Sequence, residues 1–291
     1  MVQQTSPEPE RPTGELAELL RDTIDLHVHS APDLVARQFD DLQLAQAAQH
    51  WGLRAVVLKS HVESTVGRAA IATRASRVSI FGGLALNFDV TGGISSAACD
   101  TALRLGARAI WMPTKSSLAH NRALTSDARQ PVSVAAADES GELARICDLV
   151  AQADALLGTG HAARDEIAMI ARRSQEAGTR LILTHPDWLV PKLSVAEQSE
   201  LADRFPDVTF ERCAYSISPA NPGQIPVSKT VQAIRAVGVA RNVLSSDLGQ
   251  ADGLSWPSGL AEFGRALLHH GLTEADVATM IRERPAALLW G

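Results

Sequence analysis

Residues 24–30 of this chain read Ile24-Asp25-Leu26-His27-Val28-His29-Ser30. The run is short, apolar and β-branched, which is typical of a strand. Alternate residues of a strand share one face, so His27 and His29 are expected to point the same way, with Asp25 beside them. Two imidazoles on one strand form half of a metal site. A polar strand end with hydrogen-bonded histidines is the alternative interpretation.

Apolar runs of this kind recur along the chain, and each is followed by a helical pattern. The expected strands begin near residues 24, 55, 78, 109, 155, 180, 208 and 242. Strict alternation of apolar strands and helices indicates a parallel sheet. Eight such units predict an α/β fold, a single-domain (β/α)8 TIM barrel over residues 14–291. A doubly wound open sheet is the alternative, but it would need a phosphate-binding glycine turn after an early strand.

The composition narrows the class of protein. Of the 291 residues, 45% are hydrophobic and 21% charged, and the net charge of −6 comes with no basic block, so we expect no nucleic-acid partner. No apolar run is long enough to span a bilayer, so we expect no membrane partner. Three separated cysteines favour a reducing, cytoplasmic location. Residues 1–13 are polar and rich in Pro and Glu, which predicts a disordered tail.

Histidines gather where the expected strands end, which is where the active sites of such barrels lie. Five of the nine histidines are at or just past a strand end: His27, His29, His61, His161 and His185. The other four lie on expected helices or in a long connection, and we expect them to be surface or helix-end residues: His50, His120, His269 and His270.

Asp247 closes the last expected strand. In a closed barrel the last strand neighbours the first, so Asp247 should face His27 and His29. A carboxylate there could ligate a metal, accept a proton from metal-bound water, or do both. An aspartate that caps the next turn is the alternative.

Lys59 follows four hydrophobic residues and is expected at the barrel mouth. It could hold an anionic substrate, or it could be carboxylated and bridge two metals. A lysine whose stem packs while its amine reaches water is the structural alternative. Glu211 and Arg212 end the seventh strand, and one of them must face the mouth. Arg212 could bind a substrate carboxylate and Glu211 could be a further ligand or substrate contact, unless the two belong to a structural ion pair.

The segment from Thr114 to Ser140 interrupts the alternation. A connection of this length is usually a lid, or an excursion with short structure of its own. It starts at the carboxyl end of the fourth strand, so we expect it to cover the pocket and to influence the choice of substrate.

The pattern as a whole, from Asp25 to Asp247, resembles the amidohydrolase superfamily of metal-dependent hydrolases. The resemblance implies a distorted (β/α)8 barrel with one or two divalent metals, usually zinc, and a proton shuttle at Asp247. The residues that match the family's metal ligands are His27, His29, His161, His185 and Asp247. Many binuclear members carry a bridging lysine or glutamate at the end of the fourth strand. Here Lys115 comes two residues late, so we favour Lys59 as the bridge and keep His61 as a substitute ligand.

The resemblance implies a hydrolase of a C–N or C–O bond in an amide, cyclic imide, lactone or ester, with a small-molecule substrate. A mononuclear decarboxylase of an aromatic or unsaturated acid is the first rival, with Arg212 on the substrate carboxylate. A phosphoesterase is a weaker hypothesis, because no cluster of arginines in the sequence indicates a phosphate pocket. A non-catalytic metal-binding barrel is also weaker, because a barrel needs none of these residues to fold. Whether the chain forms a homo-oligomer is left open.

Overall fold

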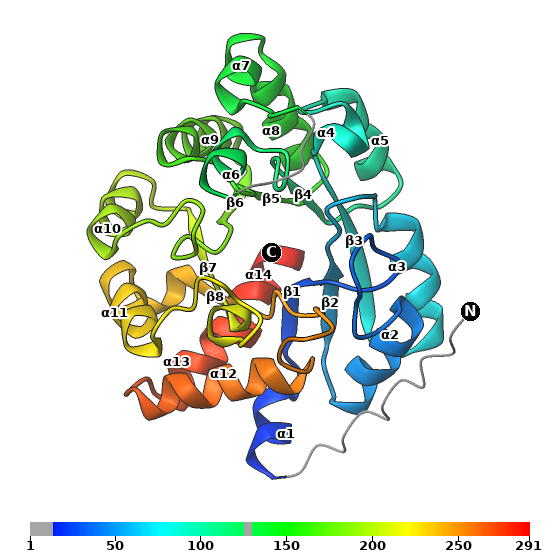
Figure 1. Ribbon diagram of the computed structural model, residues 1–291, viewed down its shortest axis with the longest axis vertical. Coiled ribbons are helices and arrows are strands. Elements are labelled where there is room, and N and C mark those ends of the chain that lie inside the picture. Colours follow the sequence, from blue (N-terminus) through cyan, green and yellow to red (C-terminus); the bar gives the residue numbers. More distant parts are fainter. Residues whose placement is uncertain (1–13, 125–129) are drawn as a thin grey trace.

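The structure, a computed structural model, describes residues 14–124 and 130–291, and the expected tail lies outside this part of the chain. Eight parallel strands follow one another around a ring in sequence order (Figure 1). They are β1 (Ile24–Val28), β2 (Ala55–Leu58), β3 (Ser79–Ala85), β4 (Ala109–Trp111), β5 (Leu156–Gly158), β6 (Arg180–Leu183), β7 (Thr209–Cys213) and β8 (Asn242–Ser245).

The sheet closes on itself where β8 returns to β1. Val28 forms a parallel bridge with Leu248, and the amide of His29 donates to the carbonyl of Leu248 at 2.8 Å. The amide of Asp247 likewise donates to the carbonyl of His27 at 2.7 Å. These bonds confirm the predicted barrel and exclude the open sheet.

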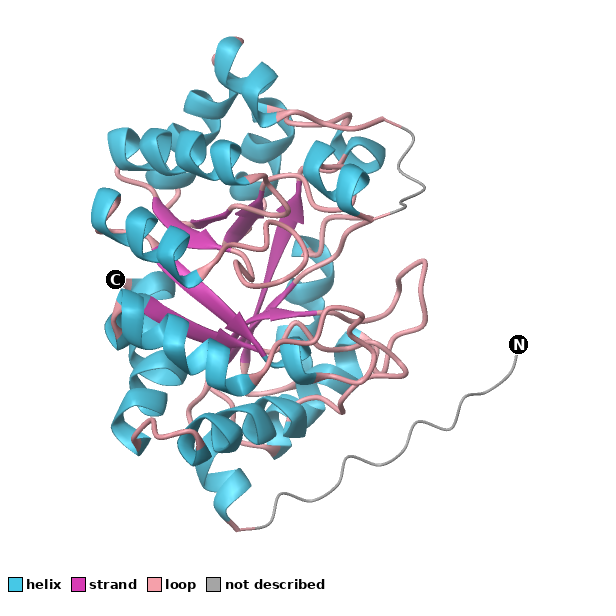
Figure 2. Cartoon of the chain, turned by 60° about the vertical axis from the view of Figure 1, so that its left-hand side comes forward, coloured by secondary structure: helices cyan, strands magenta, loops and turns pink. Residues whose placement is uncertain are grey.

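Helices cover the outside of the ring, with long loops gathered on one side of the molecule (Figure 2). They are α1 (Glu15–Leu20), α2 (Asp41–His50), α3 (Val66–Ala72), α4 (Phe88–Thr91), α5 (Ser96–Arg104), α6 (Leu118–Ala123), α7 (Val134–Glu139), α8 (Glu142–Gln152), α9 (Arg164–Ala177), α10 (Val195–Arg204), α11 (Val227–Val237), α12 (Ser258–His269), α13 (Glu274–Ala278) and α14 (Arg284–Trp290). Short 3₁₀ turns η1 (Thr73–Ala75), η2 (Ala214–Ile217) and η3 (Val239–Arg241) and a π turn η4 (Thr279–Glu283) complete the chain.

Local signals explain where several helices begin and end. The side chain of Ser194 accepts a hydrogen bond from the amide of Glu197, and the Glu197 carboxylate accepts one from the amide of Ser194, so a capping box starts α10. Gly178 ends α9 in the left-handed conformation that glycine adopts without a steric cost. Pro285 lies in the first turn of α14, where its missing N–H is tolerated, so the chain stays helical to Trp290.

The barrel is filled by side chains and is closed at its amino end. Leu288 and Leu289 of α14 pack in one cluster with inward residues such as Ile24 of β1 and Val57 of β2. This arrangement leaves the carboxyl ends of the strands as the accessible end. No helix in the described ranges is long and apolar enough to cross a membrane.

The excursion between β4 and α8 carries two short helices, α6 and α7, as expected for a segment with structure of its own. Helix α7 packs against α8 and α9. The side chain of Ser117, just before α6, donates to the carbonyl of His161 at 2.7 Å, which ties the start of the excursion to the functional end of the barrel. That the excursion covers a substrate stays a prediction.

Candidate metal centre

His27 and His29 share a face at the carboxyl end of β1, as their spacing predicts. His27 Nε2 lies 2.9 Å, and His29 Nε2 3.1 Å, from the same oxygen of Asp247, Oδ1. Both imidazoles are buried, and their ring centroids are 5.2 Å apart. The first and last strands therefore bring three candidate ligands to one point.

Asp25 does not join them, which corrects the expectation that it lies on the same face. Asp25 pairs with Val56 and Val28 pairs with Leu58, so β1 advances three residues while β2 advances two. Such a bulge breaks the strict alternation of a strand. Asp25 accepts a hydrogen bond from the indole Nε1 of Trp256 at 2.8 Å instead, and anchors β1 to the outer layer.

Asp247 is held in an uncommon backbone conformation. Its φ of 49° lies in the left-handed region, which few residues other than glycine adopt. Its amide is fixed by the carbonyl of His27, so the carboxylate is aimed back at β1. Strain of this kind is found mostly where function requires a side chain in one position.

The atoms of this cluster fit a bound metal. His27 Nε2 and His29 Nε2 both lie against Asp247 Oδ1, and His185 Nδ1 is buried with no hydrogen-bond partner among the described residues. Buried polar atoms are normally satisfied, so an unpaired imidazole nitrogen beside two imidazoles that share one carboxylate oxygen fits a cation bound among them. One ligand atom each from His27, His29 and Asp247 lies within 4.8 Å of the others. Two imidazole nitrogens and a carboxylate oxygen are a donor set that suits zinc.

The charges around the cluster are set by burial and by close contacts. Burial lowers the pKa of His29 to about 3, despite the hydrogen bond to Asp247. Burial would also lower the pKa of His27, but the carboxylates of Asp247 and Glu211 raise it to about 9. Burial would raise the pKa of Asp247, yet the contact with His27 holds it well below its ordinary value. Asp247 is therefore an ionised carboxylate, the form that ligates metals and accepts protons.

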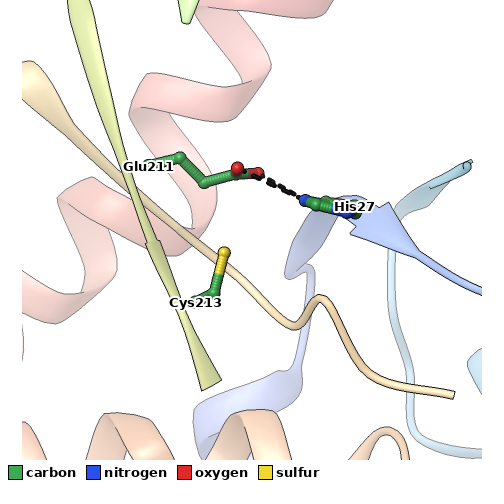
Figure 3. Close-up of side chains that lie close together, drawn as sticks. All are labelled: His27, Glu211 and Cys213. Carbon is green, nitrogen blue, oxygen red and sulfur yellow. Dashed lines mark hydrogen bonds and ion pairs between the residues drawn. The ribbon is translucent and has the colours of Figure 1, made fainter. Parts of the chain in front are cut away.

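Glu211 lies on the other side of His27 (Figure 3). Its oxygens Oε1 and Oε2 are 3.2 and 3.3 Å from His27 Nδ1, and Figure 3 shows the carboxylate of Glu211 directed at the imidazole from β7. Cys213, two residues further along β7, offers its thiol within 4.8 Å of both groups. Of the two charged residues that end β7, Glu211 is thus the one that faces the barrel.

Arg212 points the other way. Its guanidinium donates to Asn242 Oδ1 at 2.8 Å, to Asp187 Oδ2 at 2.6 Å and to Gln198 Oε1 at 2.8 Å. Alternation along β7 sends Glu211 inward and Arg212 outward. Arg212 therefore has the structural role that the sequence left open, in a network with Asn242, Asp187 and Gln198, and its guanidinium does not bond to the candidate metal ligands.

Lys59 is buried at the barrel mouth, as the apolar run before it predicts. Its Nζ has no hydrogen-bond partner within the described part of the chain and lies 5.3 Å from the centroid of the Trp111 ring. Burial lowers the pKa of Lys59 against the opposing effect of Asp247 and Glu211. Lys115 is exposed, so Lys59 is the lysine that lies among the candidate ligands.

His161, His185 and His61 complete a ring of imidazoles. The His161 and His185 rings are 5.0 Å apart, and His185 is 6.2 Å from His27. His61 stacks on His29 at 4.9 Å and its Nδ1 lies 2.8 Å from Thr114 Oγ1. The five histidines selected from strand ends are all buried or half-buried around one site, while their roles as ligands stay predictions.

His120 also belongs to this site, which corrects the expectation that it is a surface or helix-end residue. It is buried on α6, and its Nδ1 lies 2.7 Å from His161 Nδ1. The sequence carries a signal that would have found it. Ser117 is the N-cap of a helix that starts within a few residues of the end of β4, which puts the first turn of α6 near the barrel mouth.

Two tryptophans shape the site and were not predicted. Trp111 of β4 points inward, and its ring fills the space left by the missing side chains of Gly83 and Gly158 on the neighbouring strands. Trp188 contacts the His185 ring at 5.1 Å between centroids. A narrow cavity beside Asp247 is lined by His185, Trp188, Cys213 and Tyr215. The cavity measures about 20 Å³, room for about one water molecule, and charged residues such as Glu211 and Arg212 also line it.

Comparison with known proteins supports the fold. A search of curated proteins finds no match to this sequence. Among solved structures, the chain is similar to an amidohydrolase from Pseudomonas aeruginosa, with a TM-score of 0.60 and 12% identity over 94% of this chain and 98% of that one. It is also similar to a putative 2-pyrone-4,6-dicarboxylic acid hydrolase from Pseudomonas putida (TM-score 0.57, 16% identity, 92% and 97% covered). A third similar structure is 2,6-dihydroxybenzoate decarboxylase from Rhizobium (0.53, 14%, 92% and 98%).

At these identities the likeness shows a shared fold, the barrel that the resemblance implies. A family model matches residues 22–209, a range that includes all five candidate histidine ligands: His27, His29, His61, His161 and His185. The chain thus belongs to the family described as "Family of unknown function (DUF6282)".

Proposed function

We propose that this protein is a metal-dependent hydrolase that cleaves a C–N or C–O bond at a carbonyl carbon. The observation that carries the proposal is the convergence of His27, His29 and Asp247 at the carboxyl end of the barrel. A barrel does not need this polar cluster to fold, and burying it without a ligand is costly. The fold shared with amidohydrolases supports the same conclusion.

The residues that would hold the metal are His27, His29 and Asp247, with His161 and His185 beside them. Nitrogen-rich donor sets favour zinc over magnesium or calcium, so we propose Zn²⁺. A zinc ion bound there would lower the pKa of a water molecule to about 7 and polarise a carbonyl group.

Asp247 is the group we assign to proton transfer. It is ionised, it contacts both histidines of β1, and it borders a small cavity that would take the attacking water. A carboxylate so placed can take a proton from the attacking water and deliver it to the leaving amine or alcohol. Trp188 and Tyr215 line the same cavity, which has room for about one water molecule beside Asp247.

Metal analysis of the purified protein tests the proposal. We expect about one to two divalent ions per chain. The His27→Ala/His29→Ala double variant should lose metal and activity while keeping its circular dichroism spectrum. Activity is measured on a panel of amides, cyclic imides, lactones and esters. A double variant with full metal content, or a metal-loaded protein inert on the whole panel, contradicts the proposal.

A decarboxylase of an aromatic or unsaturated acid is the second candidate, and the position of Lys59 favours it. Lys59 supplies an amine inside the site, whereas the Arg212 guanidinium donates hydrogen bonds to Asn242, Asp187 and Gln198. A cation there would bind the carboxylate that leaves as CO₂. Release of CO₂ from a panel of such acids, with no hydrolysis of the first panel, would establish this alternative.

A further inference from the structure

The carboxylate of Glu211 contacts the nitrogen of His27 that faces away from Asp247. Both of its oxygens lie within 3.3 Å of His27 Nδ1, and Oε2 also accepts the amide of His185 at 3.3 Å. The side chains of His27 and Glu211 are 1% and 3% exposed, so water does not compete for these bonds. Glu211 therefore links the ends of β1 and β6.

An ionised carboxylate can only accept hydrogen bonds, so the contact requires a proton on His27 Nδ1. In neutral imidazole the other nitrogen, Nε2, then carries the lone pair. Nε2 is the atom that lies 2.9 Å from Asp247 Oδ1. Without Glu211, either nitrogen could carry the proton, and the ring would lose the bond that fixes its orientation.

We propose that Glu211 is a positioning residue, which holds His27 in the tautomer and orientation that present Nε2 to the metal. The inference rests on the proposed metal site and assigns Glu211 a role other than that of a ligand. Both oxygens of Glu211 are turned to Nδ1, on the opposite edge of the ring from the Asp247 cluster. A carboxylate bonded to a metal-binding histidine typically raises metal affinity and fixes ring orientation.

The geometry leaves one competing arrangement, in which Glu211 and Cys213 are themselves ligands together with His27. The two arrangements differ in how Glu211 acts. A positioning residue works through His27, so its removal matters only while His27 is present. A direct ligand contributes its own bond, whether or not His27 is there.

A double-mutant cycle on zinc affinity separates these cases. Zinc affinity of the full chain is measured by competition with a chromophoric chelator for wild type, Glu211→Gln, His27→Ala and the double variant. Glu211→Gln should lower the affinity about 10- to 100-fold. In the His27→Ala background the same change should lower it less than about twofold, since a positioning effect needs its histidine.

The matched control is Glu166→Gln. Glu166 is also a buried glutamate that accepts backbone amides, from Val134 and Ala163, but it contacts none of the candidate ligands. Its variant should keep wild-type affinity. Cys213→Ser should also keep it, because the proposal gives the thiol no role in binding. Nitrogen-15 shifts of His27 in the zinc-loaded protein, assigned with the His27→Ala variant, should show a proton on Nδ1 and none on Nε2 in wild type, and a mixture in Glu211→Gln.

The outcomes are distinct. Unchanged affinity in Glu211→Gln overturns the inference, and so does an undiminished loss in the His27→Ala background, which would make Glu211 a ligand. If Glu211→Gln does not fold, Glu211→Asp withdraws the carboxylate by one methylene and should lower zinc affinity in the same direction. Metal retained by the His27→Ala/His29→Ala variant would instead refute the proposed function itself.

Discussion

Lys59 places a primary amine among the candidate ligands, and its two roles predict different results for Lys59→Ala. An ammonium a few ångströms from divalent ions is repelled, on the order of a kcal/mol or more. A carbamate on Nζ relieves this by turning the cation into a bridging anion. The variant would then lose metal, and a short carboxylic acid in solution would partly restore activity.

If Lys59 instead binds an anionic substrate, Lys59→Ala should keep its metal and mainly raise KM. Metal content and steady-state kinetics distinguish the two roles. Lys115→Ala is the control, because Lys115 is exposed and should leave the metal content unchanged. A Lys59→Ala protein with wild-type metal and kinetics would make Lys59 a structural residue.

His120 should make the stability of the metal-free protein depend on pH. Burial lowers the pKa of His120 from its ordinary 6.5 to about 4. Between these values the unfolded chain binds a proton that the folded chain does not, so stability falls as the pH drops from 6.5 towards 4. The contribution lost is on the order of 1–3 kcal/mol. Urea titrations with a chelator present measure the free energy of unfolding at each pH. This free energy should fall less steeply between pH 6.5 and 4 in His120→Gln than in wild type, and an equal fall in both proteins would refute the prediction.

At the scale of elements, the Trp111 side chain of β4 packs against glycines of both neighbouring strands, Gly83 of β3 and Gly158 of β5. A Cβ atom at Gly158 would overlap the Trp111 ring, and one at Gly83 would overlap both that ring and the carbonyl of Ala109. We expect Gly158→Ala to destabilise the protein by about 1–3 kcal/mol, because the ring must leave its slot. Thermal unfolding measures the effect.

Gly67 is the control for this substitution. It lies in α3 with open space where a Cβ would stand, so Gly67→Ala should be neutral or stabilise by up to about 1 kcal/mol. The Gly158→Ala/Trp111→Leu double variant should recover part of the loss. If Gly158→Ala melts like Gly67→Ala, Trp111 is not confined as the structure indicates.

At the scale of the whole molecule, the last helix closes the barrel at the end opposite to the candidate site. Leu289 of α14 is buried against inward residues of several strands. Leu289→Ala should cost about 2–5 kcal/mol through the cavity it leaves, and the protein should still unfold in one transition. Zinc affinity at low temperature should be unchanged, because the site lies at the other end.

The exposed Leu105 provides the comparison, since Leu105→Ala should shift the free energy of unfolding by less than about 0.5 kcal/mol. A separate early transition in Leu289→Ala would show instead that α14 detaches without unfolding the barrel. Denaturant titrations followed by fluorescence and circular dichroism distinguish the two results.

The sequence by itself was enough to determine the barrel and the residues that end its strands. Apolar periodicity is a local property, so each strand and helix could be read from its own segment. The rule that active sites lie at carboxyl ends then selected His27, His29, Asp247 and Lys59 without coordinates. These residues do meet in the structure.

Only the tertiary structure decided the side of each strand on which the remaining polar residues lie. Asp25 lies outside the site because of a bulge in β1 that no apolar pattern marks. Arg212 faces outward because Glu211, its neighbour on β7, faces the barrel. His120 lies in the site because the start of α6 is held against His161, just past the end of β5. These outcomes depend on contacts between residues far apart in the chain, which periodicity within one segment does not encode.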